Sequence, residues 1–454
     1  MSEESTQSSS AGGIAKSASW LLIARIFAQA AQFLGFIIAA RTQGPAEFGI
    51  YSLALILWLF ILKVAEAGWS ERLMGTDEGW GALHAISWIS SAIGGLLTLA
   101  LAGVGFLLGV SPEVPVLLAV FSLALPLSAA ATLQRGVLIS RGQPNRVGQA
   151  WIVSEAISFV CLVIMLDAGF GVVALAASKI VYAAVLFAVS VAMTRWFQLV
   201  WPTRQEVVDA AVYSKSLLAS RMTYFAQENI SAVLVGLFLG PVAVGFYRAG
   251  ARMAGAVAEV IGETFRIVSW SQLSHARRRS ATVPGALEAE GTRLFGLLIA
   301  LAPPAFIGLA IVATPLTVAL LGEEWLPSAL VIALLAMKRL VQIPNVLLEP
   351  ILSMQNRIHL APRIAYLSII SSLTALVVCA PFGLAAAAYG QLAAGIVISP
   401  LIVRLLATEG KVDLMAALRF GVPALVALPC MVGIVYLAGY ALRDIDAGER
   451  LAAM

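Results

Sequence analysis

Four basic side chains lie within strongly apolar stretches of this sequence. Arg25, Arg221, Arg252 and Lys338 each fall in a hydrophobic run of about 20 residues, the length of helix that crosses a lipid bilayer. A cation at the bilayer centre costs about 2.5 to 3.5 kcal/mol, so each of these groups needs water or a partner beside it. Arginine suits phosphate in particular, because its planar fork of N–H donors fits two oxygens at once. The pattern predicts an internal cationic cavity for an anionic substrate.

Other polar residues share helical faces with these cations, at about 100° of rotation per residue. The residues expected to line the substrate cavity are Arg25, Gln29, Gln32, Lys63, Arg221, Arg248, Arg252, Lys338, Gln342 and Asn345. The alternative is that the cations form ion pairs that hold helices together, such as Lys63 with Glu66 at a spacing of three. Arg25 and Arg221 favour the cavity, because neither has an acid within one turn on its own helix.

Several carboxylates also lie inside the apolar runs. A carboxyl group in a medium of low dielectric constant can hold a proton, and a carboxylate can bind sodium, so these acids are candidates for coupling transport to an ion gradient. The candidates are Glu66, Glu228, Glu259 and Glu263. Their alternative role is to neutralise the neighbouring arginines. No metal site, cofactor or catalytic residue is expected, since the three histidines and three cysteines lack the spacing of metal ligands.

The elements that position these residues are expected to be membrane-spanning helices. Of the 454 residues, 60% are hydrophobic and only 12% are charged, against roughly 25% charged in soluble domains. The apolar runs are continuous, which excludes the alternating strands of a membrane barrel. Thirteen spans are predicted, at roughly 17–40, 48–69, 84–109, 114–138, 147–167, 171–194, 214–239, 242–268, 294–320, 327–352, 364–380, 383–406 and 420–441.

Charged residues between the spans predict the orientation of the chain. Most lysines and arginines outside the spans fall on one side, which the positive-inside rule places in the cytoplasm. The N-terminus is therefore expected in the cytoplasm and, after thirteen crossings, the C-terminus in the periplasm. The acidic, serine-rich residues 1–16 are expected to form a disordered cytoplasmic tail. The net charge of +4 gives no reason to expect binding to nucleic acid.

An internal repeat predicts the arrangement of the spans. Residues 21–51 align without a gap with residues 217–247, so that Arg25 meets Arg221 and the motif GPAEFGIY meets GPVAVGFY. Six spans separate the copies, which predicts two six-helix lobes related as parallel repeats by a pseudo-twofold axis. Each GPxxxGxY motif is interpreted as the turn between the first two helices of a lobe. The expected boundaries are an N-lobe at 17–195, a cytoplasmic linker at 196–213, a C-lobe at 214–406, and an extra helix with a tail at 407–454.

Three segments resemble a known family. The opening SASWLLIARIFAQAAQFLGFIIAARTQGPAEFGIYSLA, the later LGPVAVGFYRAGARM, and LLGEEWLPSALVIALLA are similar to the polysaccharide transporters of the multidrug/oligosaccharidyl-lipid/polysaccharide flippase superfamily. The resemblance implies a multi-pass protein of the bacterial inner membrane that flips polyprenyl-pyrophosphate-linked oligosaccharides to the periplasmic leaflet, for O-antigen, capsule or exopolysaccharide. The cavity would then bind pyrophosphate and sugar, with coupling to Na⁺ or H⁺. Polysaccharide polymerases and chain-length proteins are implied as partners, beside membrane lipids.

Other functions stay open on the sequence alone. A cation-coupled multidrug exporter has the same architecture, although surplus basic residues disfavour its cationic cargo. A flippase for peptidoglycan lipid precursors would also share the fold. A membrane-embedded polymerase or ligase for lipid-linked sugars is disfavoured, because the longest loops, near 195–213 and 269–293, lack an acid–base constellation. The sequence therefore favours a transporter over an enzyme.

Overall fold

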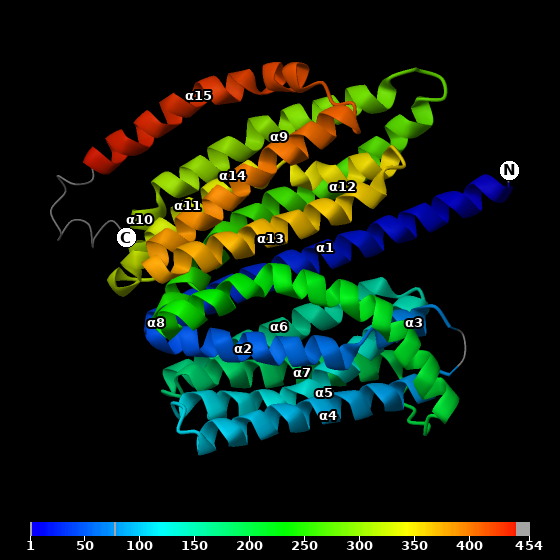
Figure 1. The fold of residues 1–454 in the computed structure, drawn as a ribbon. Coiled ribbons are helices and arrows are strands. Elements are labelled where there is room, and N and C mark those ends of the chain that lie inside the picture. Colours follow the sequence, from blue (N-terminus) through cyan, green and yellow to red (C-terminus); the bar gives the residue numbers. More distant parts are fainter. Residues whose placement is uncertain (1, 77–78, 442–454) are drawn as a thin grey trace. The chain divides into compact units, whose positions relative to one another are not determined.

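The computed structural model describes residues 2–76 and 79–441, and this part of the chain consists of helices joined by short turns (Figure 1). The α-helices are α1 (Ser2–Thr42), α2 (Pro45–Glu66), α3 (Trp69–Met74), α4 (Trp80–Leu107), α5 (Glu113–Ser140), α6 (Pro144–Asp167), α7 (Val172–Thr194), α8 (Arg204–Arg279), α9 (Ala286–Ile311), α10 (Ala313–Leu320), α11 (Leu326–Gln342), α12 (Asn345–Met354), α13 (Ala361–Cys379), α14 (Leu384–Thr408) and α15 (Leu414–Ala441). The expectation of an all-α chain is confirmed. The last residues of the expected C-terminal tail, 442–454, lie outside the described residues.

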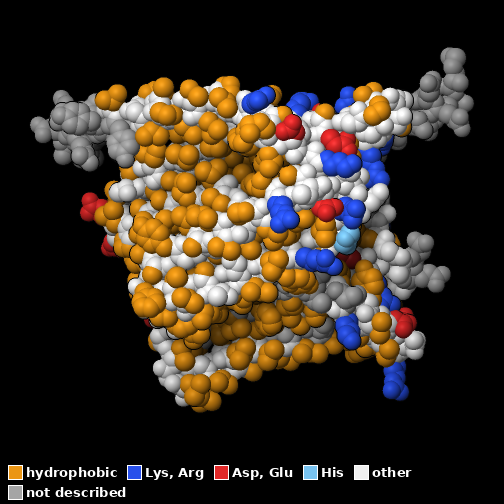
Figure 2. Space-filling view, turned by 45° about the horizontal axis from the view of Figure 1, so that its top comes forward, with side chains coloured by type: hydrophobic (Ala, Val, Ile, Leu, Met, Phe, Trp, Pro, Cys, Tyr) orange, Lys and Arg blue, Asp and Glu red, His pale blue; other side chains and the backbone are white. Residues whose placement is uncertain are grey.

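The chain is a multi-pass membrane protein. In its described part, twelve helical segments are long and apolar enough to cross a bilayer. Large hydrophobic side chains stay exposed on them, as on α4, where Leu96 is 67% and Phe106 74% exposed. Figure 2 shows hydrophobic side chains over much of the visible surface. Such exposure is costly in water and favourable against lipid, so it fits helices whose outer faces contact acyl chains.

Helix α8 accounts for the difference from the thirteen expected spans. Its apolar segment, Arg221–Arg279, is 59 residues long, whereas one crossing takes about 20. The helix is interrupted at Gly240, whose φ of 82° and ψ of 179° are not helical. The break falls between the expected spans 214–239 and 242–268. With Arg221–Arg279 counted as one segment, the described residues hold twelve candidates, and the number thirteen is not confirmed.

The two GPxxxGxY motifs have corresponding local roles. Gly44 lies between α1 and α2 with φ −65° and ψ 168°, and the proline after it begins α2. Gly240 is likewise extended in ψ and is followed by proline, which lacks an N–H and cannot continue the hydrogen bonding of the preceding turn. The tyrosines that end the motifs, Tyr51 and Tyr247, are 6% and 5% exposed. Each motif therefore interrupts a helix and starts the next segment, in agreement with its architectural interpretation.

The first helix begins earlier than the sequence suggested. Helix α1 starts at Ser2, so residues 2–16, expected as a disordered tail, are part of it. No proline lies between residues 2 and 42. The hydrogen-bonded turns of the apolar segment can therefore continue toward the N-terminus, because a helix is easier to extend than to nucleate.

The chain divides into two compact units, residues 1–230 and residues 231–454, called unit 1 and unit 2 below. The division differs from the expected start of the C-lobe at residue 214, because the beginning of α8 packs in unit 1. The ring of Phe225 lies 5.8 Å from that of Phe60, and Ala210 belongs to a buried cluster that includes Trp69. Leu217 covers Gly68 so closely that an added Cβ at this glycine would lie 2.3 Å from its side chain.

Unit 1 is built around α5. This helix packs against α2, α3, α4 and α7, while α1 packs mainly against α6. Leu117, Phe121 and Leu125 on α5 are completely buried, and the ring of Phe121 stacks on Trp58 of α2 at 5.1 Å. At the other end of α5, a Cβ at Gly136 would lie 2.8 Å from Ser70 Oγ, so glycine is needed for α3 to approach this closely.

Unit 2 is held together by the pairs α9 with α15, α11 with α14, and α13 with α14. Small residues permit the last contact, because a Cβ at Gly390 of α14 would lie 2.9 Å from Cys379 Sγ of α13. Trp325 is completely buried and meets the ring of Phe246 edge-on at 6.1 Å. The cysteines are free thiols in the described structure, as their apolar positions suggested.

Candidate functional site

The polar face of α1 reaches α6 inside unit 1. Arg25, Gln29 and Gln32 follow one another at spacings of four and three, so the helix presents them on one side. Arg25 and Gln32 are exposed and Gln29 is half-buried. The amide of Gln32 donates a 3.4 Å hydrogen bond to Glu155 Oε2 on α6, and Glu155 is only 6% exposed. The expected glutamine face is therefore partly used to satisfy a buried carboxylate.

Lys63 and Glu66 on α2 form the ion pair that their spacing of three suggested. Lys63 Nζ lies 2.9 Å from Glu66 Oε2, with the lysine 40% and the glutamate 8% exposed. The hydroxyl of Thr132 on α5 donates to the other oxygen, Glu66 Oε1, at 2.9 Å. Both oxygens are thus engaged, which agrees with the counter-ion role for Glu66. Thr132 was not identified from the sequence, since a threonine in an apolar helix commonly bonds only its own backbone.

Arg221 of α8 contacts Glu71 of α3, also within unit 1. Arg221 Nη2 lies 2.6 Å from Glu71 Oε1, and the side chains are 22% and 32% exposed. The second oxygen, Glu71 Oε2, is buried without a hydrogen-bond partner in the described structure. Sequence reasoning missed Glu71 because it follows the expected span 48–69. The carboxylate of Glu228, further along α8, is exposed.

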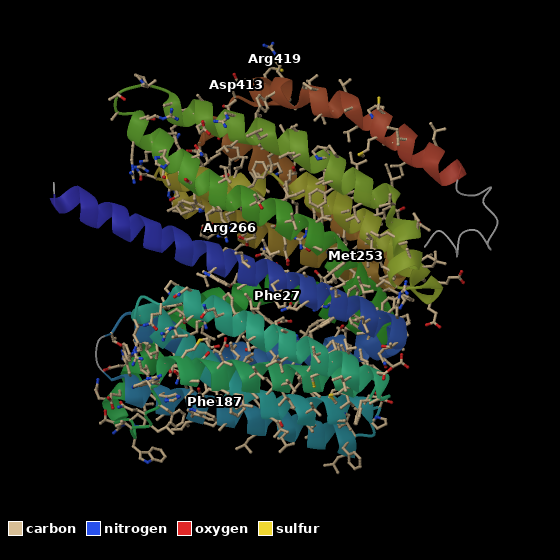
Figure 3. All side chains as sticks on the ribbon, turned by 180° about the vertical axis from the view of Figure 1, so that it is seen from behind. Phe27, Phe187, Met253, Arg266, Asp413 and Arg419 are labelled. Carbon is tan, nitrogen blue, oxygen red and sulfur yellow. The ribbon has the colours of Figure 1, made fainter. Side chains whose placement is uncertain are left out.

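In unit 2, the part of α8 after Gly240 carries the longest charged face. Arg248, Arg252 and Glu263 are half-buried and Glu259 is exposed. Arg266 Nη2 donates to Glu263 Oε2 at 2.7 Å, an ion pair whose arginine is 49% exposed. Figure 3 labels Arg266 on this helix. The face therefore combines two arginines near its start with a carboxylate-rich second half.

The ammonium group of Lys338 lies in a polar cluster between three apolar helices of unit 2. Lys338 on α11 donates to Gln391 Oε1 on α14, and its Nζ lies 3.4 Å from Ser372 Oγ on α13. Gln391 is completely buried, and its amide group donates to the carbonyl oxygen of Ser372 at 2.9 Å. Gly395 lets α14 pack on the lysine stem, since an added Cβ would lie 3.2 Å from Lys338 Cγ. Neutral oxygens thus hold this cation inside the bundle.

The expected stripe beyond Lys338 crosses a helix boundary. Gln342 is the last residue of α11, and Asn345 is the first of α12. Pro344 lies between them and lacks the N–H that would continue the helix. Gln342 is half-buried and Asn345 is exposed. A Cβ added at Gly395 would lie 3.6 Å from Gln342 Cγ. Gln391 and Ser372 were not predicted, although a lone glutamine in the apolar run 383–406 was a usable signal.

The structure thus brings the candidates into local groups within each unit. Unit 1 pairs Gln32 with Glu155, Lys63 with Glu66, and Arg221 with Glu71, whereas unit 2 joins Lys338 to Gln391. Across the described residues, no group of three or more His, Cys, Asp or Glu could hold a metal ion.

Comparisons with known proteins agree with a transporter. A family model described as a polysaccharide biosynthesis protein matches residues 38–330. The succinoglycan biosynthesis transport protein ExoT of Rhizobium meliloti (strain 1021) is 26% identical over 341 residues, which are 73% of this chain and 67% of that protein. Among solved structures, the lipid II flippase MurJ in an inward closed conformation has a TM-score of 0.70 at 14% identity, covering 95% of this chain and 93% of MurJ. An inward-facing multidrug resistance MATE transporter of the MOP superfamily has a TM-score of 0.62 at 13% identity, covering 84% of this chain and 96% of that one.

Proposed function

Because the chain belongs to the family of polysaccharide biosynthesis proteins, we propose that it is a flippase for lipid-linked oligosaccharides. Its substrate would be a polyprenyl-pyrophosphate carrying a sugar repeat unit, moved from the cytoplasmic to the periplasmic leaflet of a bacterial inner membrane. The named relative is a succinoglycan transport protein, and the fold is that of MurJ and the MATE transporters. These similarities support a role as a transporter, whereas the proposed substrate is chosen because of the charged residues within the apolar spans.

The observation that carries the proposal is the ammonium group of Lys338 among apolar helices. Its contacts with Gln391 and Ser372 place a positive charge beside neutral oxygens inside unit 2. Together with Arg248 and Arg252 in unit 2, and with Arg25 and Arg221 in unit 1, it supplies cations within apolar spans. A pyrophosphate headgroup carries the charge that such groups attract, whereas the organic cations of drug exporters would be repelled.

Carboxylates set the conditions under which the arginines bind substrate. Arg221 is held by Glu71 when no substrate is bound, so a pyrophosphate must compete with that carboxylate. A ligand shifts the conformation of a transporter only through a difference in affinity between its states. We infer that the substrate binds these arginines more strongly in the conformation that precedes translocation, and that alternating access between the two membrane faces follows.

Coupling to an ion gradient would use the buried carboxylate of Glu66. Protonation or sodium binding at this group would weaken its hold on Lys63, 2.9 Å away, and would free that ammonium group for the substrate. Glu228, Glu259 and Glu263 are the other candidates for the same role. The flippase would act with a polysaccharide polymerase and chain-length proteins, which use its product in the periplasm.

Substitution of Lys338 tests this function. In a strain that lacks the chromosomal gene, Lys338→Met should abolish surface polysaccharide and cause lipid-linked oligosaccharide to accumulate in the cytoplasmic leaflet, whereas Lys338→Arg should retain part of the export. The matched control is Lys215→Met, which removes an exposed lysine from α8. Normal export by Lys338→Met at wild-type abundance would refute the proposal. Loss of organic-cation efflux with unchanged polysaccharide would favour a drug exporter.

A further inference from the structure

A basic cavity lies at one end of unit 1, apart from the candidate substrate residues. It has a volume of about 570 Å³ and is lined by Arg141, Arg146 and Arg195, together with uncharged residues that include Gln143 and Thr194. Among the described residues that line it, none carries a carboxylate side chain. Three guanidinium groups around one space attract an anion, because their potentials add where no acid offsets them.

Two of the arginines are fixed by the end of α7. Arg141 follows the last residue of α5, and its Nη1 donates to the carbonyl oxygen of Thr194. Arg146, in the first turn of α6, donates through Nη1 to the carbonyl oxygen of Met193 at 3.0 Å. The last carbonyls of a helix have no partner within it, so they accept these bonds at little cost. Each guanidinium has five N–H donors, so four remain for a ligand on each arginine.

The third arginine occupies a backbone position that favours glycine. Arg195 caps α7 with φ 48° and ψ 32°, in the left-handed region that non-glycine residues rarely adopt. Its N–H donates to the carbonyl oxygen of Val191 at 2.8 Å, while its side chain is exposed and faces the cavity. An arginine at this position accepts backbone strain that glycine would avoid, and in return adds a third cation to the same space.

The cavity lies where the membrane-spanning segments end. The adjoining candidate spans end at Ser140, begin at Pro144 and end at Thr194, so we expect the three arginines at the depth of lipid headgroups. Arg146 also begins a continuous face of α6. At spacings of seven, four, three and four residues, it is followed by four exposed apolar side chains, which are Val153, Ile157, Val160 and Ile164, 40% to 61% exposed. A cationic site beside an exposed apolar stripe matches an anionic lipid, with a charged headgroup joined to acyl chains.

We propose that this cavity binds the phosphate of an anionic glycerophospholipid from the same leaflet, with an acyl chain along α6. The lipid would join the ends of α5, α6 and α7 by bonding all three arginines. It would stay bound as part of the protein rather than be transported, so this site does not depend on the proposed flippase activity. The pyrophosphate of a polyprenyl lipid presents the same chemistry, and the test must distinguish the two sources.

The test titrates the full-length protein in detergent with phosphatidylglycerol and counts bound lipids by native mass spectrometry. Saturable binding of phosphatidylglycerol, in preference to phosphatidylcholine, is expected. Arg195→Gln should weaken it about fivefold, as expected for the loss of one cation at a membrane surface. The control is Arg278→Gln, which removes another exposed cation, at the end of α8, that does not line the cavity. Arg195→Gly serves as a second variant. Glycine removes the backbone strain and should keep the fold, while the lipid affinity should fall as much as in Arg195→Gln.

Three outcomes would overturn the proposal. The first is unchanged phosphatidylglycerol binding in both Arg195 variants. The second is an equal loss in the Arg278→Gln control, which would mean that only net charge matters. The third is displacement of bound phosphatidylglycerol by a few equivalents of polyprenyl pyrophosphate, which would assign the cavity to the transported lipid. Resistance to that competitor, with weakened binding in the Arg195 variants, supports the phospholipid site.

Discussion

The guanidinium group of Arg221 and the carboxylate of Glu71 lie 2.6 Å apart although 150 residues separate them in the chain. The contact joins α8 to α3 within unit 1, and both side chains are partly exposed. It gives an arginine inside an apolar span the acid that its own helix does not provide. Because both side chains are accessible to water, Arg221 could exchange the Glu71 carboxylate for the anionic group of a substrate.

Exchanging the two charged residues distinguishes a structural role of this ion pair from a role in substrate binding. A partly exposed ion pair contributes roughly 0.2 to 1 kcal/mol, so Glu71→Gln should lower the unfolding temperature in detergent only slightly. The double variant Arg221→Glu with Glu71→Arg should recover that stability but not polysaccharide export, because the cation has moved to another helix. Recovery of export in the exchanged protein would show that the pair has only a structural role.

Glu66 provides a sharper stability test, because it is 8% exposed and both of its oxygens are engaged. Glu66→Leu should destabilise the protein by about 1 to 3 kcal/mol, since it removes the acceptor of the Lys63 ammonium group and one of the two acceptors of the Thr132 hydroxyl. Thr132→Val, which removes the one hydroxyl that reaches both Glu66 and the carbonyl oxygen of Ser128, should cost about 1 kcal/mol. Thermal unfolding in detergent measures both, and equal small losses in the two variants would contradict the arrangement.

The Lys338 cluster can be tested by removing its partner. Gln391→Leu buries an apolar group where a carbonyl oxygen had accepted from the lysine, and we expect a loss of about 1 to 3 kcal/mol in unfolding free energy. Adding Lys338→Met should recover part of it, because the lysine no longer lacks an acceptor, whereas the Ser372 hydroxyl, which donated to Gln391 Oε1 at 2.7 Å, still does. A double variant as unstable as Gln391→Leu alone would show that the cluster is not a coupled unit.

The two motif glycines form a matched pair for backbone strain. At Gly240, with φ 82° and ψ 179°, alanine should cost about 1 to 3 kcal/mol, because this region is almost restricted to glycine. At Gly44, with φ −65°, alanine adopts the same dihedral angles without strain. An added Cβ at Gly240 meets no atom within 4 Å, so the difference would report the backbone alone. Equal unfolding temperatures for Gly240→Ala and Gly44→Ala would contradict the break in α8.

The N-terminal end of α8, which lies outside the apolar spans, should have a stability that depends on pH. Hydrogen bonds from the Thr203 N–H at 2.7 Å and from its hydroxyl at 2.8 Å lower the pKa of Glu206 below its ordinary value of 4.5. A carboxylate whose folded pKa is depressed stabilises the fold above its unfolded pKa, and this contribution is lost as the pH falls through the folded value. The protection of amides near Thr203 from exchange, relative to their intrinsic rate at each pH, should therefore fall at acidic pH. In Glu206→Gln the rate should follow only the intrinsic pH dependence of exchange.

Much of the fold followed from hydrophobic pattern alone. Long apolar runs predict membrane helices because an unpaired backbone group is too costly in hydrocarbon, and most of the expected spans correspond to single helices. The Lys63 and Glu66 pair was also predictable, since a spacing of three places both residues on one face of a helix. Composition and local spacing are properties that one helix has by itself.

Tertiary structure decided which helices meet, and hence the partners of the buried charges. The packing of residues 204–230 in unit 1 depends on surfaces such as Gly68 against Leu217, which no local pattern specifies. The contacts of Arg221 with Glu71, and of Lys338 with Gln391, join helices far apart in the chain. The sequence by itself determined that cations lie inside apolar spans. Only the folded chain decided which oxygens stabilise them, because that choice depends on distances between helices rather than on the periodicity of any one of them.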